Sequence, residues 1–171
     1  QVSCSAIAGG TAGMTTRGDD PDPDAVHALR FKAPESGAIA FTGEHFVPGL
    51  TGPIQHEHHH RYLLAAPFCR DRSVLDIACG EGYGADLLTQ VAARVVGLDI
   101  DLAAVAAAQR RYGSERLRFV PADAMAVPFA SSSFDVATSF ETIEHVADWR
   151  TFVAEVARVL RPDGLLIVSS P

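Results

Sequence analysis

The sequence predicts an α/β fold with a Rossmann-like parallel sheet in three α/β/α layers, and two patterns support this prediction. Short apolar runs, continuous as in strands buried on both faces, begin near residues 74, 94, 117, 134 and 165. Segments with apolar residues at helical spacing separate most of these runs, most clearly residues 102–112 and 149–160. Strands that alternate with helices form a parallel sheet with right-handed crossovers. We expect the strand order 3-2-1-4-5, numbered along the chain, with a ligand where strands 1 and 4 end.

The first apolar run leads into three alternate glycines, Gly80, Gly82 and Gly84, and then into a helical pattern. Strand, glycine turn and helix form the entry half of a βαβ unit. Because glycine has no Cβ, a ligand can lie directly against its backbone, and the helix start offers free N–H groups to an anion. The glycine spacing also satisfies the dinucleotide pattern G-x-G-x-x-G/A, so it does not identify the ligand by itself.

Asp76 lies inside the first apolar run, where an unpaired charge is costly. A dinucleotide pyrophosphate would add negative charge, whereas the ammonium of an amino acid moiety could pair with Asp76. The alternative is that Asp76 only accepts hydrogen bonds from loop N–H groups. Together with the three glycines, Asp76 resembles motif I of the class I S-adenosylmethionine-dependent methyltransferases. The resemblance implies S-adenosyl-L-methionine as the cofactor.

Composition sets broad limits on the class of protein. The length of 171 residues and the 47% hydrophobic share fit one globular domain. The net charge of -7 argues against a general nucleic-acid binder, and no apolar run is long enough to cross a membrane. The three cysteines lack metal-ligand spacing, which favours reduced thiols in the cytoplasm. Residues 1–36 are expected to be mobile, with Met14 as a natural start, and the domain to occupy residues 37–171.

A helix is expected over residues 54–66, after Pro53 and before Pro67. His56 and His60 share one face of this helix, as in a two-histidine metal site, although a solvated histidine-rich helix is the simpler interpretation. A similar segment precedes the core of many bacterial methyltransferases and ends in the pair seen here as Arg61-Tyr62. The resemblance implies that this segment covers the methionine end of the cofactor, with Tyr62 in the site. In that segment His45 stands where an arginine is usual.

Acidic residues follow the second and third apolar runs. Asp99 ends the second run about 20 residues beyond Gly80, the position of a ribose-binding carboxylate, and an ordinary loop aspartate is the alternative. Asp101 is expected to cap the next helix. The resemblance implies that Asp123 and the N–H of Ala124 meet the adenine, with a helix cap by Asp123 as the alternative. It also adds three residues to the cofactor site: Ala78, Ile100 and Phe140.

The fourth apolar run leads into a segment that contains Glu141, Glu144 and His145. In a methyltransferase this segment lies where the acceptor binds. Glu141 and His145 are therefore the catalytic candidates, and His145 is the better base because imidazole titrates near neutral pH. A structural role for His145 is the alternative. The E-x-x-E-H spacing is also similar to that of O-methyltransferases that hold a divalent metal, but we expect no metal here.

The predicted function is methyl transfer from S-adenosylmethionine to a small-molecule acceptor, on an oxygen atom. A non-catalytic S-adenosylmethionine-binding or scaffolding domain is the main alternative, followed by an NAD-dependent dehydrogenase. The resembled family continues beyond the fifth strand with a helix and strands 6 and 7, the last antiparallel. Because the sequence stops at Pro171, we expect that part to be missing. The sequence does not indicate the acceptor or the oligomeric state.

Overall fold

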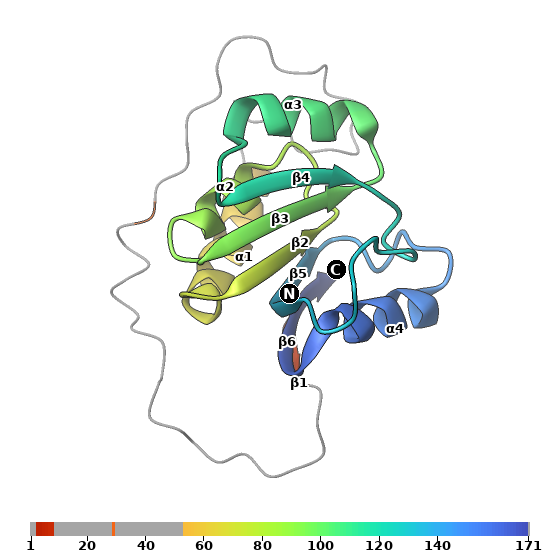
Figure 1. Ribbon diagram of the computed structural model, residues 1–171. Helices are drawn as coiled ribbons and strands as arrows, with labels where there is room; N and C mark the ends of the chain where they lie inside the picture. The colour runs from red at the N-terminus through yellow and green to blue at the C-terminus, as the bar shows by residue number, and fades with distance from the viewer. Residues whose placement is uncertain (1–2, 9–28, 30–52, 171) are drawn as a thin grey trace.

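The computed structural model describes residues 3–8, 29 and 53–170, with side chains placed for residue 29 and residues 59–170 (Figure 1). His45 and the rest of residues 30–52 lie outside this part. The elements are β1 (Ser3–Ala8), α1 (Pro53–Cys69), β2 (Ser73–Ile77), α2 (Tyr83–Thr89), β3 (Arg94–Asp99), α3 (Leu102–Tyr112), β4 (Leu117–Pro121), β5 (Phe134–Phe140), α4 (Trp149–Val159) and β6 (Leu160–Ser170).

The described strands form one six-stranded sheet in the order β1-β6-β5-β2-β3-β4. The five strands from β2 to β6 are parallel, and their order is the predicted 3-2-1-4-5. That prediction is therefore confirmed. The parallel register aligns Asp76 of β2 with Gly97 of β3 and Thr138 of β5.

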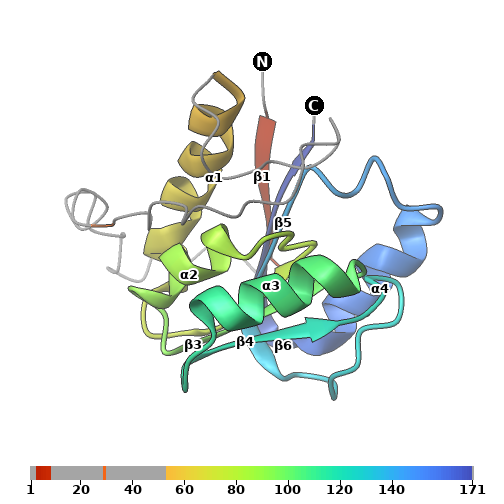
Figure 2. The ribbon, with the colours of Figure 1, turned by 90° about the horizontal axis from the view of Figure 1, so that it is seen from above.

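The sequence did not lead us to expect β1. It pairs antiparallel with β6, from Ser3 opposite Ser170 to Ala8 opposite Leu165 (Figure 2). Residues 3–8 therefore differ from the mobile segment that we predicted over residues 1–36. The physical reason is that the free edge of β6 offers unpaired N–H and C=O groups, which an extended segment of almost any composition can satisfy.

Helices cover both faces of the parallel strands, which gives the three predicted layers (Figure 1). Successive residues of β2 point to opposite faces. Val74 packs with residues from α1, α2 and α3, and Leu75 packs with residues from α4. The predicted cap is present, because Asp101 accepts hydrogen bonds from the first turn of α3, and Asp148 caps α4 in the same way.

Two element boundaries differ from the prediction. The α1 helix continues through Pro67 to Cys69. Proline lacks one helix hydrogen bond, but Ala65, Ala66 and Cys69 are buried and hold the last turn on the core. Residues 161–164, whose Arg-Pro-Asp-Gly sequence predicts a turn, instead lie inside β6 as an irregularity, between the pairs Phe134–Leu160 and Val136–Leu165.

Candidate cofactor and acceptor site

The carboxyl ends of β2, β3, β4 and β5 lie along one edge of the sheet, because these strands are parallel and adjacent. The topology therefore gathers most predicted site residues at this edge. They are Asp123 and Ala124 after β4, Asp99 and Ile100 at the end of β3, Ala78, Gly80, Gly82 and Gly84 after β2, and Phe140 and Glu141 at the end of β5. Tyr62 reaches the same edge from α1, where its ring lies 4.9 Å from that of Phe140.

The three glycines of the turn have different surroundings. Gly80 has a left-handed φ of +51°, and a Cβ placed on it would meet no atom of the described residues within 4 Å. A Cβ on Gly82 would lie 2.5 Å from the ring of Phe119, and one on Gly84 would overlap the ring of Tyr62. Open backbone of the kind predicted for a ligand is therefore found at Gly80. At the other two positions, neighbouring rings occupy the space of a side chain.

Asp99 joins the end of β3 to the glycine turn. Its Oδ2 accepts a hydrogen bond from Gly80 N at 2.7 Å, and its Oδ1 accepts one from Asp101 N at 2.9 Å. Each carboxylate oxygen keeps a second acceptor site, and the side chain is only half-buried, so a ribose diol can still reach it. The next residue, Ile100, is 75% exposed and offers an apolar surface to a planar ring.

Asp76 is fully buried, with 0% of its surface exposed. Thr138 Oγ1 donates a hydrogen bond to its Oδ1 at 2.7 Å, and Tyr62 OH donates one to its Oδ2 at 3.1 Å. Its recorded donors are therefore side-chain hydroxyls from β5 and α1, rather than the loop N–H groups of the alternative interpretation. A cofactor ammonium reaches this carboxylate only if neighbouring groups move, so the predicted pairing stays a prediction.

Burial decides the protonation of this cluster. It raises the pKa of Asp76 to about 7, although the hydroxyls of Thr138 and Tyr62 oppose the shift. Burial also raises the pKa of Tyr62 well above its usual range, and the charge of Asp76 adds to this. At neutral pH, Tyr62 is therefore a neutral donor, and Asp76 is divided between its protonated and ionised forms. A cation placed beside Asp76 would favour the ionised form.

Asp123 and Ala124 lie in a turn after β4. Asp123 Oδ1 accepts a hydrogen bond from Met125 N at 2.8 Å, and the Asp123 side chain is exposed. The structure has no helix between β4 and β5, so the hydrogen bond stabilises a turn rather than a helix start. Recognition of adenine by these two residues stays a prediction.

Glu141 is already engaged by two partners. Its Oε1 lies 3.2 Å from Arg61 Nη2 and accepts a hydrogen bond from Ser169 Oγ at 3.0 Å. Glu141 also has a left-handed φ of +53°, and Ala78 after β2 has one of +58°. Strained backbone of this kind clusters at functional sites. Glu141 Oε1 is thus held by two donors, whereas the His145 side chain is exposed.

Glu144 and His145 are exposed in a turn before α4. His145 N donates to Thr142 O at 2.9 Å, and α4 begins only at Trp149. The α-helical turn that would project Glu141, Glu144 and His145 to one side is therefore not formed. Among the described residues, no group of three or more His, Cys, Asp or Glu side chains could hold a metal ion. The side chain of His56 lies outside the described part, and His60 is exposed.

Two polar residues of this region are absent from the predicted site. Thr138 lies in an apolar run, and only the strand register reveals that it is opposite Asp76. Arg61 precedes Tyr62 on α1, and its residue surface is 6% exposed. The sequence signal for Arg61 was its place beside Tyr62 in the segment said to cover the methionine end.

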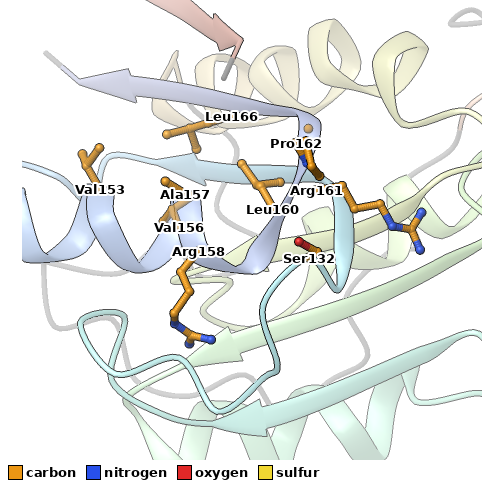
Figure 3. A pocket seen from close by; sticks show the side chains of 10 residues that line it. Ser132, Val153, Val156, Ala157, Arg158, Leu160, Arg161, Pro162 and Leu166 are labelled. Carbon is orange, nitrogen blue, oxygen red and sulfur yellow. The ribbon is translucent and has the colours of Figure 1, made fainter. Parts of the chain in front are cut away.

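A hollow of about 310 Å³ lies at the opposite end of the strands (Figure 3). It is lined by α4 and the start of β6, including Val153, Val156, Leu160 and Leu166. Because Leu160 and Ser132 lie at the amino ends of β6 and β5, this hollow is not part of the site at the carboxyl ends. None of the described helices is long and apolar enough to span a membrane.

Residues 75–168 match the family described as a methyltransferase domain, and the chain belongs to that family. A Mycolicibacterium smegmatis relative, named as a probable S-adenosylmethionine-dependent methyltransferase, is 43% identical over 136 residues, which are 78% of this chain and 52% of the relative. A Mycobacterium tuberculosis relative described in the same way is 40% identical over 158 residues, covering 91% of this chain and 54% of the relative. The chain thus spans about half the length of these two curated relatives.

A third relative matches over a shorter part of this chain. The phthiotriol/phenolphthiotriol dimycocerosates methyltransferase 1 of Mycobacterium ulcerans is 41% identical over 98 residues, covering 56% of this chain and 36% of the relative. All three relatives are methyltransferases by name. The resemblance to class I S-adenosylmethionine-dependent methyltransferases is therefore confirmed.

Solved structures show the same fold. The YcgJ protein from Bacillus subtilis superposes with a TM-score of 0.61 at 34% identity, covering 65% of this chain and 50% of that chain. The [4+2]-cyclase SpnF superposes with a TM-score of 0.63 at 26% identity, covering 74% and 48% respectively.

The described residues fit S-adenosylmethionine, the cofactor in the names of the first two relatives. Gly80 has open space above its backbone, and Asp99 and Ile100 offer a carboxylate and an exposed apolar surface beside it. Whether the methionine end of the cofactor also fits depends on how its amino acid moiety is placed against Asp76, Tyr62 and Arg61.

Proposed function

We propose that this chain is the cofactor-binding part of an enzyme that transfers a methyl group from S-adenosylmethionine to a small-molecule acceptor. The observation that carries the proposal is the arrangement of Gly80, Asp99 and Ile100 at the ends of adjacent strands β2 and β3. The open backbone at Gly80 leaves room for a ligand against the turn. The half-buried carboxylate of Asp99 can accept hydrogen bonds from the ribose of a nucleoside, and the exposed side chain of Ile100 can pack against its adenine. An NAD-dependent dehydrogenase would bind with similar elements, but the relatives are methyltransferases by name.

Different residues would bind different parts of the cofactor. Asp99 would bind the ribose hydroxyls, Ile100 would pack against the adenine, and Asp123 with Ala124 N–H would bind the adenine edge. Tyr62, Phe140, Asp76 and the backbone at Ala78 and Gly80 would enclose the methionine end. Bound S-adenosylmethionine supplies an electrophilic methyl group, so the protein has mainly to align the acceptor with it.

We propose an oxygen atom as the nucleophile and His145 as the base that takes its proton. The exposed position of His145 after β5, next to the cofactor edge, supports this role. Glu141 would orient the acceptor side of the site through its ion pair with Arg61 rather than take the proton. The acceptor itself belongs to a small-molecule class, in line with the name of the phthiotriol/phenolphthiotriol relative.

A non-catalytic or differently catalytic cofactor-binding domain is the second candidate. It is favoured by the similar fold of SpnF, which is named a [4+2]-cyclase, because one fold can support several activities. Calorimetry with S-adenosylmethionine, S-adenosylhomocysteine and NAD tests the cofactor. Turnover with a panel of hydroxylated acceptors then separates a methyltransferase from a domain that only binds.

The proposed location is the cytoplasm, without nucleic-acid partners. The net charge of -7 disfavours a polyanion, and Cys69 and Cys79 are free, as in a reducing compartment. Cell fractionation with an antibody to the chain tests the location.

A further inference from the structure

The connection between β4 and β5, residues 122–133, contains neither a helix nor a strand. It carries Asp123 and Ala124, the two residues proposed to bind the adenine edge. A segment without regular secondary structure is readily mobile unless other elements bind it. The position of the two adenine residues therefore depends on what the connection is bound to.

Two side chains of α4 bind the connection through its backbone. Arg158 Nη1 donates a hydrogen bond to Phe129 O at 2.7 Å, and Arg158 Nη2 donates one to Val127 O at 2.9 Å. Glu155 Oε2 accepts a hydrogen bond from Val127 N at 3.0 Å. Figure 3 shows the Arg158 side chain pointing from α4 toward this connection. Both backbone groups of Val127 are thus held by α4.

Arg158 and Glu155 also fix each other. Arg158 Nε donates to Glu155 Oε1 and Arg158 Nη2 donates to Glu155 Oε2, both at 2.9 Å. These hydrogen bonds lower the pKa of Glu155, so its carboxylate is ionised at neutral pH. The planar guanidinium therefore binds a carboxylate and two backbone carbonyls at once, which the single ammonium of a lysine cannot reproduce.

A short chain of contacts links this pair to Asp123. Val127 is 4% exposed and belongs to the core cluster that contains Phe152 and Val156 of α4. The two residues before Val127 bind Asp123, because Met125 N donates to its Oδ1 at 2.8 Å and Ala126 N donates to its carbonyl at 3.0 Å. A displacement of Val127 would therefore carry the Asp123 carboxylate with it.

We propose that Arg158 and Glu155 are positioning residues for recognition of the cofactor's base. They hold the β4–β5 connection in the place from which Asp123 and the N–H of Ala124 meet adenine. Neither side chain contacts the base itself. The inference rests on the proposed function, and it assigns part of the base specificity to a helix outside the cofactor site.

The experiment measures base preference rather than stability. Calorimetry compares S-adenosylhomocysteine with S-inosylhomocysteine, in which an oxo group replaces the adenine amino group. The wild type should prefer the adenine ligand about tenfold to a hundredfold, the factor for a hydrogen bond to a charged group. Arg158→Met should lose most of this preference, and Arg158→Lys should lose it in part. Preference for the ordinary over the 2′-deoxy ligand, which depends on Asp99, should change less than about twofold.

A double variant separates positioning from a general loss of stability. If Arg158 acts through Asp123, Arg158→Met should reduce the base preference of an Asp123→Ala protein no further, because both changes remove the same interaction. Arg150→Met, which removes an exposed arginine stacked on Trp149 of the same helix, is the matched control and should behave as the wild type. Thermal unfolding shows which variants are folded. If Arg158→Met is not, Glu155→Gln carries the test, because it keeps an acceptor for Val127 N but loses the charge that fixes Arg158.

Three outcomes would overturn the proposal, and they differ in what else they remove. A folded Arg158 or Glu155 variant with the full preference for adenine removes the positioning role alone. Equal binding of both ligands by the wild type also removes the proposed role of Asp123, although the cofactor stands. Absence of S-adenosylhomocysteine binding by the wild type removes the proposed cofactor as well.

Discussion

Two aspartates on adjacent strands differ in how far they are buried and in what donates hydrogen bonds to them. Asp76 of β2 and Asp99 of β3 both follow apolar residues at the carboxyl-end side of the sheet. Asp76 is fully buried, and side-chain hydroxyls are its donors. Asp99 ends its strand, is half-buried, and receives backbone N–H groups from Gly80 and Asp101. The β2 end of the site is thus closed around its carboxylate, and the β3 end is open.

The comparison shows that the position of an aspartate relative to the strand end decides whether a ligand can reach its carboxylate. Asp76 lies one residue before the end of β2 and faces the α1 side, where Tyr62 covers it. Asp99 is the last residue of β3, so its side chain projects from the sheet edge. Ligand contact at the closed end requires a rearrangement, whereas ligand contact at the open end does not.

The largest expected effect is on stability at the closed end. The unfolded chain releases the Asp76 proton near pH 4, but the folded chain keeps it until about pH 7. Between these values the folded state binds more protons, so the free energy of unfolding falls as pH rises, by at most about 1.4 kcal/mol per pH unit. Urea unfolding from pH 4 to pH 8 measures this slope. Asp76→Asn should flatten it, and the exposed Asp163→Asn should not.

A second effect concerns cofactor affinity at the closed end. If Asp76 pairs with the ammonium, Asp76→Ala should weaken S-adenosylmethionine binding by about 2–4 kcal/mol, because the ammonium then lacks its partner. Pairing with the ionised form should also release a proton below pH 7. Calorimetry in two buffers of different ionisation enthalpy detects that proton. Unchanged affinity, with no proton released, would mean that Asp76 only supports Tyr62 and Thr138.

At the open end, Asp99→Asn should weaken binding by about 1.5–3 kcal/mol through loss of a charge-assisted hydrogen bond to the ribose. The comparison ligand is the 2′-deoxy cofactor, which already lacks one of the two hydroxyls. Wild type should prefer the ordinary cofactor, and Asp99→Asn should show little preference. Equal binding of both ligands by the wild type would contradict the ribose role.

The smallest expected effects are those of alanine substitutions at Gly84 and Gly80, which should differ from each other. Gly84→Ala should lower the free energy of unfolding by about 1–3 kcal/mol, because its Cβ would overlap the buried Tyr62 ring. Gly80→Ala meets no such contact, and its left-handed φ should cost about 1 kcal/mol. Its methyl group would instead occupy the open side of the turn and weaken cofactor binding. Urea unfolding and calorimetry on both variants check this contrast, which fails if Gly80→Ala binds the cofactor as the wild type does.

The sequence was sufficient for the strand order and for the residues at the strand ends, because short apolar runs and glycines are local signals. It was insufficient for features that depend on residues distant in the sequence, such as the surroundings of each glycine and the partners of Asp76. Nothing local distinguishes Gly80 from Gly84, since the difference is the ring of Tyr62 from a helix before β2. The pairing of Thr138 with Asp76 needs the register of strands that are 62 residues apart along the chain.

The acceptor side was the least predictable. The E-x-x-E-H spacing is similar to that of O-methyltransferases that hold a divalent metal, but in the structure Glu141 has a left-handed φ and pairs with Arg61. Both features come from tertiary contacts of β5 with α1 and β6, and neither is visible in spacing. His145 and Glu144 are exposed.

The pairing of β1 with β6 has a consequence for biosynthesis. Ser3 pairs with Ser170, so the first and last described strands are neighbours in the sheet. During translation β1 is the first of the described strands to leave the ribosome, yet its partner is the last of them to be made. Non-local pairs of this kind close slowly and late. Until β6 emerges, the backbone groups of β1 lack their partner strand in the native sheet, and unpaired strand edges of this kind are open to pairing with other chains.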